Sequence, residues 1–271
     1  MSATTASPAR PDSTGGGLVG TIASEWTKLW SVRSTWWCLA GTAALMGLFA
    51  AAFAYPPENT ANIPRSALLL PVEQTSIGAL VLAQFPVIAL AVLVITAEYA
   101  TGSIRSTLLW DARRGRVLLA KAAVLSPVVL VTGTAIAALA AVSADVVAGD
   151  YGVFVPADVA DASVRIGCYL AVAAIFALGM GTAIRSTAGA LTTVFLLFLL
   201  VPYVLSLAGS DLLVTISHYL PGFAGMEFVG TADFLGVDDL PYGPAGGLVI
   251  FLAWTAAAVL TGYVVFRVRD A

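Results

Sequence analysis

Hydrophobic residues gather in six long runs that are separated by shorter polar segments. A helix needs about 20 mostly apolar residues to cross a bilayer, and each run is close to that length. The runs cover approximately residues 36–54, 77–97, 122–147, 166–184, 188–208 and 245–266. This pattern predicts an all-α integral membrane protein whose six transmembrane helices belong to one domain over residues 18–271.

The composition points to the same class of protein. Of the 271 residues, 59% are hydrophobic and only 11% are charged, whereas soluble domains have about 25% charged residues. These values exclude an ordinary soluble enzyme and a nucleic-acid binder, which needs a basic face. Cys38 and Cys168 lie within apolar runs, and His218 is the only histidine. We therefore expect neither a disulfide framework nor a metal site.

The N-terminal tail and the basic residues predict how the chain is oriented. Residues 1–17 are small, polar and rich in glycine and proline. They lack the apolar core of a signal peptide, so we expect a disordered cytoplasmic tail. With the N-terminus inside, every Lys and Arg except Arg65 and Arg165 lies on the inner side. Because basic loops stay in the cytoplasm, the chain is expected to be a multi-pass protein of the cell membrane with both termini cytoplasmic.

An amphipathic segment, residues 18–33, precedes the first span. Its predicted apolar face holds Ile22, Trp26, Leu29 and Trp30. Charge elsewhere on the segment comes from Glu25, Lys28 and Arg33. Such a segment is typical of a helix that lies in the inner leaflet with its tryptophans at headgroup depth. The alternative is a plain cytoplasmic extension of the first span.

The loop between the second and third spans, residues 97–121, is longer than a simple connector needs to be. It is strongly basic, and it carries Ile104, Leu108 and Leu109 at helical spacing between Gly102 and Gly115. We expect a short cytoplasmic helix at about 103–110. An apolar stripe framed by charge suits docking on a cytoplasmic partner. The alternative is that the basic residues only set the orientation of the chain in the membrane and contact lipid headgroups.

The loop between the fifth and sixth spans, residues 209–244, has no Lys or Arg and contains two apolar pieces, 212–220 and 223–229. Each piece is too short to span a bilayer. They are expected to form short helices at the outer face, either a re-entrant gate or an external surface helix. The residues proposed for an outer gate are His218, Pro221, Gly222 and Phe223.

Several kinds of chemistry are missing from the sequence. The predicted spans have essentially no ionisable residue at mid-depth, which argues against a proton- or sodium-driven carrier. No phosphate-binding loop, His-Glu-x-x-His helix or Gly-x-Ser-x-Gly elbow occurs, so we expect a non-catalytic chain with no cofactor of its own. Energy for any uphill transport would have to come from another polypeptide.

Two segments carry a resemblance to a known family. SEWTKLWSVRSTWW (24–37) resembles the amino terminus of actinobacterial ABC-2 type transporter permeases, and AEYATGSIRSTLLWDARRGRVLLAKA (97–122) is similar to their loop between the second and third spans. Six spans and a broken apolar loop before the last one complete a likeness that covers nearly the whole chain after residue 18. One departure is Trp30, where relatives often have a basic residue.

The resemblance implies a division of labour between subunits. Two six-span permeases, either two copies or a copy and a paralogue, would sit on two ATPase subunits that bind ATP and magnesium. Residues 18–32 look like the family's connecting helix, 101–110 like its coupling helix, and 212–229 like its extracellular gate. The residues implied to couple to the ATPase are Glu98, Tyr99, Thr101, Gly102, Ile104, Arg105, Leu108 and Leu109.

The function expected from the sequence is that of the membrane subunit of an ATP-binding cassette exporter. Mostly apolar walls suit an amphiphilic or lipid-like cargo, either a small molecule or a peptide. A route between the halves is expected along spans two and five. Its candidate polar contacts are Gln84, Thr192, Thr193 and Tyr203. The alternative is a non-transporting membrane anchor or sensor that binds a cytoplasmic partner. Membrane lipid is a further expected partner, and nucleic acid is not expected to bind.

Overall fold

The computed structural model describes residues 17–56, 64–103, 114–230 and 240–268. Most of the predicted tail and the predicted coupling residues Ile104, Arg105, Leu108 and Leu109 lie outside these ranges. Two short elements, α3 (Arg65–Leu68) and the strand β1 (Leu70–Pro71), precede the second span, and η1 (Gly149–Tyr151) and the strand β2 (Gly152–Val153) follow the third. The two strands pair in parallel, with Leu70 opposite Gly152.

Six helices of the described chain are long and apolar enough to cross a membrane. They are α2 (Arg33–Ala54), α4 (Val72–Thr101), α6 (Arg114–Ala148), α7 (Pro156–Ile184), the continuous stretch α8 (Thr187–Phe195), η2 (Leu196–Leu200) and α9 (Val201–Ser206), and α12 (Pro244–Val268). The six predicted spans are therefore confirmed as helices. All of the helices except the fifth, Thr187–Ser206, are longer than the apolar runs, because helical hydrogen bonding continues into polar turns such as the one that begins α7 at Pro156.

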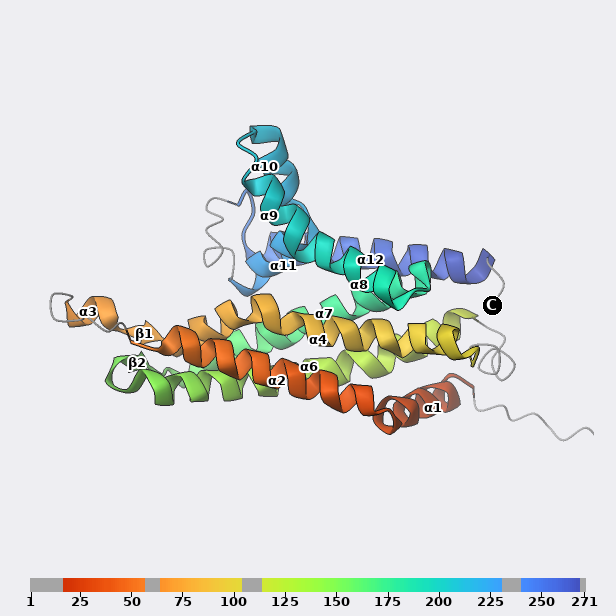
Figure 1. The fold of residues 1–271 in the computed structure, drawn as a ribbon, viewed down its shortest axis with the longest axis horizontal. Coiled ribbons are helices and arrows are strands. Elements are labelled where there is room, and N and C mark those ends of the chain that lie inside the picture. The colour runs from red at the N-terminus through yellow and green to blue at the C-terminus, as the bar shows by residue number, and fades with distance from the viewer. Residues whose placement is uncertain (1–16, 57–63, 104–113, 231–239, 269–271) are drawn as a thin grey trace, which may run out of the picture.

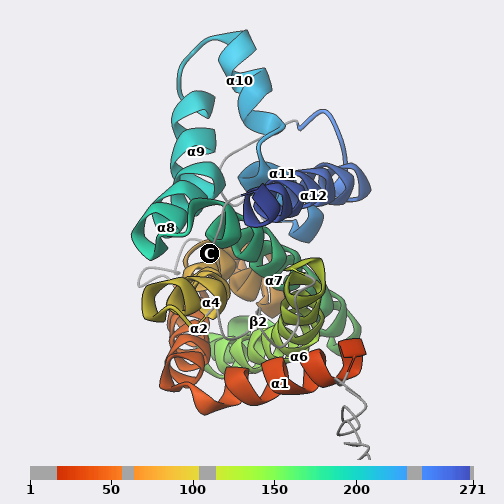
Figure 2. The ribbon, with the colours of Figure 1, turned by 90° about the vertical axis from the view of Figure 1, so that its right-hand side faces the viewer.

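The helices α2, α4, α6 and α7 run along one another and form the main bundle (Figure 1). α7 is the most buried of the six spans and is rich in alanine and glycine, which let helices approach closely where lipid removes the usual drive for apolar burial. α8 and α12 cover the α7 side of this bundle (Figures 1 and 2). Residues 185 and 186 join α7 to α8, with Arg185 in the left-handed conformation at the end of α7.

The first helix, α1 (Gly17–Ser31), is separate from α2 and lies crosswise over one end of the bundle (Figure 2). α4 ends at this end and α6 begins there, and the last turn of α12 is on the same side (Figure 1). We call it the basal end. The opposite, distal end carries the paired strands β1 and β2.

Away from the basal end, α9 and the short helix α10 (Asp211–His218) project from the bundle (Figures 1 and 2). The chain then bends by 63° into α11 (Pro221–Val229), which lies beside the start of α12. The two short helices predicted between the fifth and sixth spans are thus present. α12 begins near α11 and runs back toward the basal end. Taken together, α10 and α11 also pass the length and composition test for a broken or re-entrant span.

Candidate functional site

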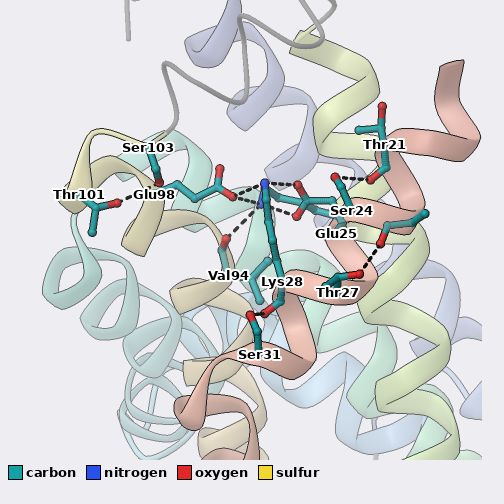
Figure 3. Close-up of polar contacts among 12 residues, drawn as sticks. Thr21, Ser24, Glu25, Thr27, Lys28, Ser31, Val94, Glu98, Thr101 and Ser103 are labelled. Carbon is teal, nitrogen blue, oxygen red and sulfur yellow. Dashed lines mark hydrogen bonds and ion pairs between the residues drawn. The ribbon is translucent and has the colours of Figure 1, made fainter. Parts of the chain in front are cut away.

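Four charged side chains from three helices meet at the basal end, and Figure 3 labels three of them, Glu25, Lys28 and Glu98. Glu25 and Lys28 come from α1, Glu98 from the last turn of α4, and Lys121 from the second turn of α6. Lys121 Nζ lies 2.7 Å from Glu25 Oε2 and 2.7 Å from Glu98 Oε1. Lys28 Nζ lies 2.7 Å from Glu25 Oε1 and 3.1 Å from Glu98 Oε1. We call these four residues the basal cluster.

The two lysines of the basal cluster differ sharply in burial. The Lys121 side chain is 1% exposed and the Lys28 side chain 43%, although both contact the same two carboxylates. Lys121 also donates to the main-chain carbonyl of Val94, 3.3 Å away. Taking charges out of water is unfavourable unless each is paired and hydrogen-bonded. The cluster meets this condition with two carboxylates and two ammonium groups, so its formal charges cancel.

Lys28 stays protonated in these surroundings. Its partial burial by itself would lower the pKa, but the hydrogen bond and charge of Glu25 and the nearby charge of Glu98 outweigh burial. The net effect is to raise the pKa of Lys28 above its ordinary value of 10.5. Lys28 therefore keeps its positive charge at neutral pH.

A cavity of about 370 Å³ opens beside the basal cluster, and we call it the basal cavity. Its wall is mainly aliphatic, from α1, α4 and α6, and hydroxyl groups of the α1–α2 junction lie on its other side. Its lining includes Lys28, Leu29, Leu93, Ala97, Glu98 and Leu125. The cavity thus joins an apolar wall to a charged rim.

The basal cluster contains two of the residues singled out from the sequence and two that were missed. Lys28 and Glu98 were candidates, whereas Glu25 and Lys121 were not. The prediction that Glu25 lies away from the buried face of α1 is wrong, because Glu25 is only 4% exposed. Helical periodicity assigns a carboxylate to the solvated side, and it gives no sign of a lysine 96 residues away that neutralises it.

The predicted apolar face of α1 is accordingly rotated. Leu29 is buried and Ile22 is half-buried, but Trp26 is half exposed. The indole rings of Trp26 and Trp30 lie edge to face, 5.8 Å apart, and Trp30 also contacts Trp36 of α2 at 5.2 Å. These rings hold the corner between α1 and α2, while Arg33 is exposed at the start of α2.

Other predicted coupling residues surround the end of α4. Tyr99 packs against the Arg185 guanidinium, whose carbon lies 5.1 Å from the ring centre. Thr101 shares a hydrogen bond with Ser103, 2.9 Å apart. Gly102 takes the left-handed conformation that ends α4, with φ of 72°, as expected for a helix-breaking glycine.

The candidate pathway residues are not brought into one lining. Gln84 is fully buried in the bundle, where its amide oxygen accepts a hydrogen bond from the Tyr169 hydroxyl at 2.5 Å. Thr192 and Tyr203 are exposed on α8 and α9, and Thr193 donates to a carbonyl of its own helix. A side chain buried inside one bundle cannot line an open route, so the assignment of Gln84 to the pathway is not supported in this conformation.

The candidate gate residues lie where α10 meets α11. Pro221 is at the start of α11, and Gly222 and Phe223 are buried beside it. The Tyr242 hydroxyl donates to the main-chain carbonyl of His218. In the part of the chain that the structure describes, no three His, Cys, Asp or Glu side chains are close enough together to hold a metal ion.

Comparisons with known proteins leave the family open. No protein-family model matches this sequence, and no curated protein matches it. Assignment to the ABC-2 permeases therefore rests on the resemblance of residues 24–37 and 97–122 and is a proposal.

Proposed function

We propose that this chain is the membrane-spanning permease subunit of an ATP-binding cassette exporter. It would move an amphiphilic or lipid-like molecule out of the cell, with ATP hydrolysed by a separate ATPase subunit. The observation that carries the proposal is the basal cluster, because it joins α1 to the two helices on either side of the basic loop. A functional unit would contain a second permease copy or a paralogue.

The proposed orientation places the basal end in the cytoplasm. Lys28, Arg33, Lys121, Arg185 and Arg267 all belong to helix ends on that side, and basic residues favour the cytoplasmic face. The crosswise position of α1 suits a helix that lies along the inner surface of the membrane. Both termini would then be cytoplasmic, and α10 and α11 would lie toward the outside.

The basal cluster suggests how force could enter the bundle. A partner that moves residues 104–113 would pull on the end of α4 and the start of α6, which Glu98 and Lys121 connect directly. Glu25 ties α6 to α1 through Lys121, and Lys28 ties α4 to α1 through Glu98, so the three elements would move together. A short buried ion pair transmits displacement because separating its charges in a low dielectric is costly.

The test uses the two leucines of the basic loop. The chain is first purified from its native host to identify an associated ATPase, and the complex is reconstituted in vesicles. Leu108→Asp with Leu109→Asp should lower transport-linked ATP hydrolysis about tenfold or more, because an unpaired carboxylate is costly to bury in an interface. Val19→Asp is the matched control, since it adds a negative charge at an exposed position of α1.

Unchanged coupling in the double variant would remove residues 104–109 from the proposed ATPase contact. If a cytoplasmic protein without ATPase activity co-purifies instead, the chain would act as an anchor or sensor.

A further inference from the structure

Glu98, which lines the basal cavity, has a buried carboxylate oxygen that no described residue uses. Glu98 is 9% exposed and lines the cavity. Its Oε1 atom accepts hydrogen bonds from both Lys28 and Lys121, but among the described residues no donor reaches Oε2. A buried acceptor without a donor is unfavourable, so a ligand that brought a donor to Oε2 would relieve this cost.

The chemistry of this oxygen favours a cationic donor over an anion. A carboxylate oxygen accepts hydrogen bonds and cannot donate one, so a phosphate or carboxylate group has no N–H or O–H to offer Oε2. The free oxygen belongs to a carboxylate, and the strongest partner for it is a charged N–H group. The ligand group that fits is therefore a primary ammonium.

The rest of the cavity favours a hydrocarbon chain. Leu29, Leu93 and Leu125 lie on its aliphatic wall, and α1, which forms one side, lies across the end of the bundle. The volume of about 370 Å³ is at the lower end of the range for small-molecule sites. It is enough for a headgroup and the first part of one chain.

We propose that the basal cavity binds a membrane lipid with a primary ammonium headgroup, whose N–H groups donate to Glu98 Oε2 while one acyl chain follows the leucine wall. A choline headgroup fills a similar space but has no N–H to donate. The site is built by this chain alone, so it does not depend on an ATPase partner. Discrimination between the two headgroups is its distinguishing property.

The experiment measures lipid retained by the purified full-length chain. Detergent micelles are doped in turn with phosphatidylethanolamine, phosphatidylcholine or phosphatidylglycerol of identical acyl chains, and retained lipid is counted by native mass spectrometry. Phosphatidylethanolamine should be retained about tenfold more than phosphatidylcholine, because only its headgroup donates a charge-assisted hydrogen bond. Equal retention of the two, preferred retention of phosphatidylglycerol, or no retention would overturn the proposal.

Two pairs of variants locate the site. Ala97→Phe fills the cavity without changing charge, and its control is Ala100→Phe, which is exposed on the same helix and does not line the cavity. Glu98→Gln removes the acceptor charge. Its control is Glu73→Gln, because Glu73 also has a carboxylate oxygen with no partner among the described residues, but at the distal start of α4.

Selective retention should fall to the phosphatidylcholine level in Ala97→Phe and Glu98→Gln and persist in both controls. Retention that survives Ala97→Phe would place the lipid elsewhere and overturn the proposal, even if Glu98→Gln fails to fold. The measurement needs no ATPase, so selective lipid binding without any ATPase association would contradict only the proposed transport function.

Discussion

Two regions of the molecule, the basal end and the surroundings of α11, are held together by different kinds of contact. At the basal end, α1, α4 and α6 are joined by four charges and enclose a cavity. Beside α11, the segments α7, η2 and α12 are joined to one another by aromatic contacts. Phe198 lies 5.1 Å from Phe176 and 5.7 Å from Phe251, and Tyr169 stacks on Phe251 at 5.3 Å.

Glycine makes the α11 contact possible. A Cβ atom on Gly222 would overlap the main-chain carbonyl of Phe198, and one on Gly225 would lie 2.6 Å from the Tyr169 ring. Phe198 is within the π-helical turn η2, and Pro202, four residues later, has no N–H to donate to its carbonyl. α11 therefore packs directly against an irregular stretch of backbone.

The basal cluster and the α11 contact should respond differently to substitutions. Charges at the basal end can exchange partners around a cavity, but removing one leaves another buried and unpaired. The α11 contact involves no charge in its core and has no room for additional atoms. The basal end is therefore sensitive to charge, and the α11 region is sensitive to volume.

The largest effect is expected from the buried lysine. Lys121→Met should lower the free energy of unfolding by about 3–5 kcal/mol, because it leaves two buried carboxylates short of a cation. Lys28→Met is the matched control with the same two partners, and its half-exposed ammonium should be worth less than about 1 kcal/mol. Unfolding in mixed micelles, followed by tryptophan fluorescence, measures both. Equal losses would show that burial does not govern the basal cluster.

The α11 contact should show the second largest effect. Gly222→Ala is expected to lower the free energy of unfolding by about 1–3 kcal/mol, since the new methyl group overlaps the Phe198 carbonyl. Gly47→Ala in α2 is the control, because a Cβ there meets nothing within 4 Å. Unfolding in mixed micelles, followed by tryptophan fluorescence, measures both variants. An unchanged free energy of unfolding in Gly222→Ala would contradict the tight contact.

A smaller loss is expected in the middle of the bundle. Tyr169→Phe removes the hydroxyl that donates to Gln84, and an interhelical hydrogen bond of this kind is worth about 1 kcal/mol. Tyr203→Phe changes an exposed tyrosine and should be neutral. A loss in transport without a loss in stability for the Tyr169 variant would instead return Gln84 to the pathway.

The smallest effect concerns pH. Because the folded-state pKa of Lys28 is raised, its contribution is fully present below its ordinary value of 10.5 and is lost as pH rises through the higher folded value. The difference in unfolding free energy between the native chain and Lys28→Met should thus stay constant from neutral pH up to 10.5. A difference that disappears between neutral pH and that value would contradict the raised pKa.

The spans were predictable because a membrane helix must satisfy its own backbone and cover it with apolar side chains. Their ends were not, since the start of α4 at Val72 or α7 at Pro156 depends on polar residues that hydropathy ignores. The break between α1 and α2 also followed from the pattern. In the basal cluster, Lys28 and Glu98 could be singled out from the sequence segments in which they lie. The pairing of Glu25 with Lys121 could not, because it arises only when distant helices pack together.

The proposed orientation of the basal end is tested most directly by labelling from outside the cell. In a chain whose Cys38 and Cys168 are replaced by alanine, single cysteines are placed at Ser103 on the basal side and at Asp150 on the distal side, both exposed positions. A membrane-impermeant maleimide applied to intact cells should react at position 150 and reach position 103 only after the cells are permeabilised. Reaction at position 103 in intact cells would contradict a cytoplasmic basal end and, with it, an ATPase docked there.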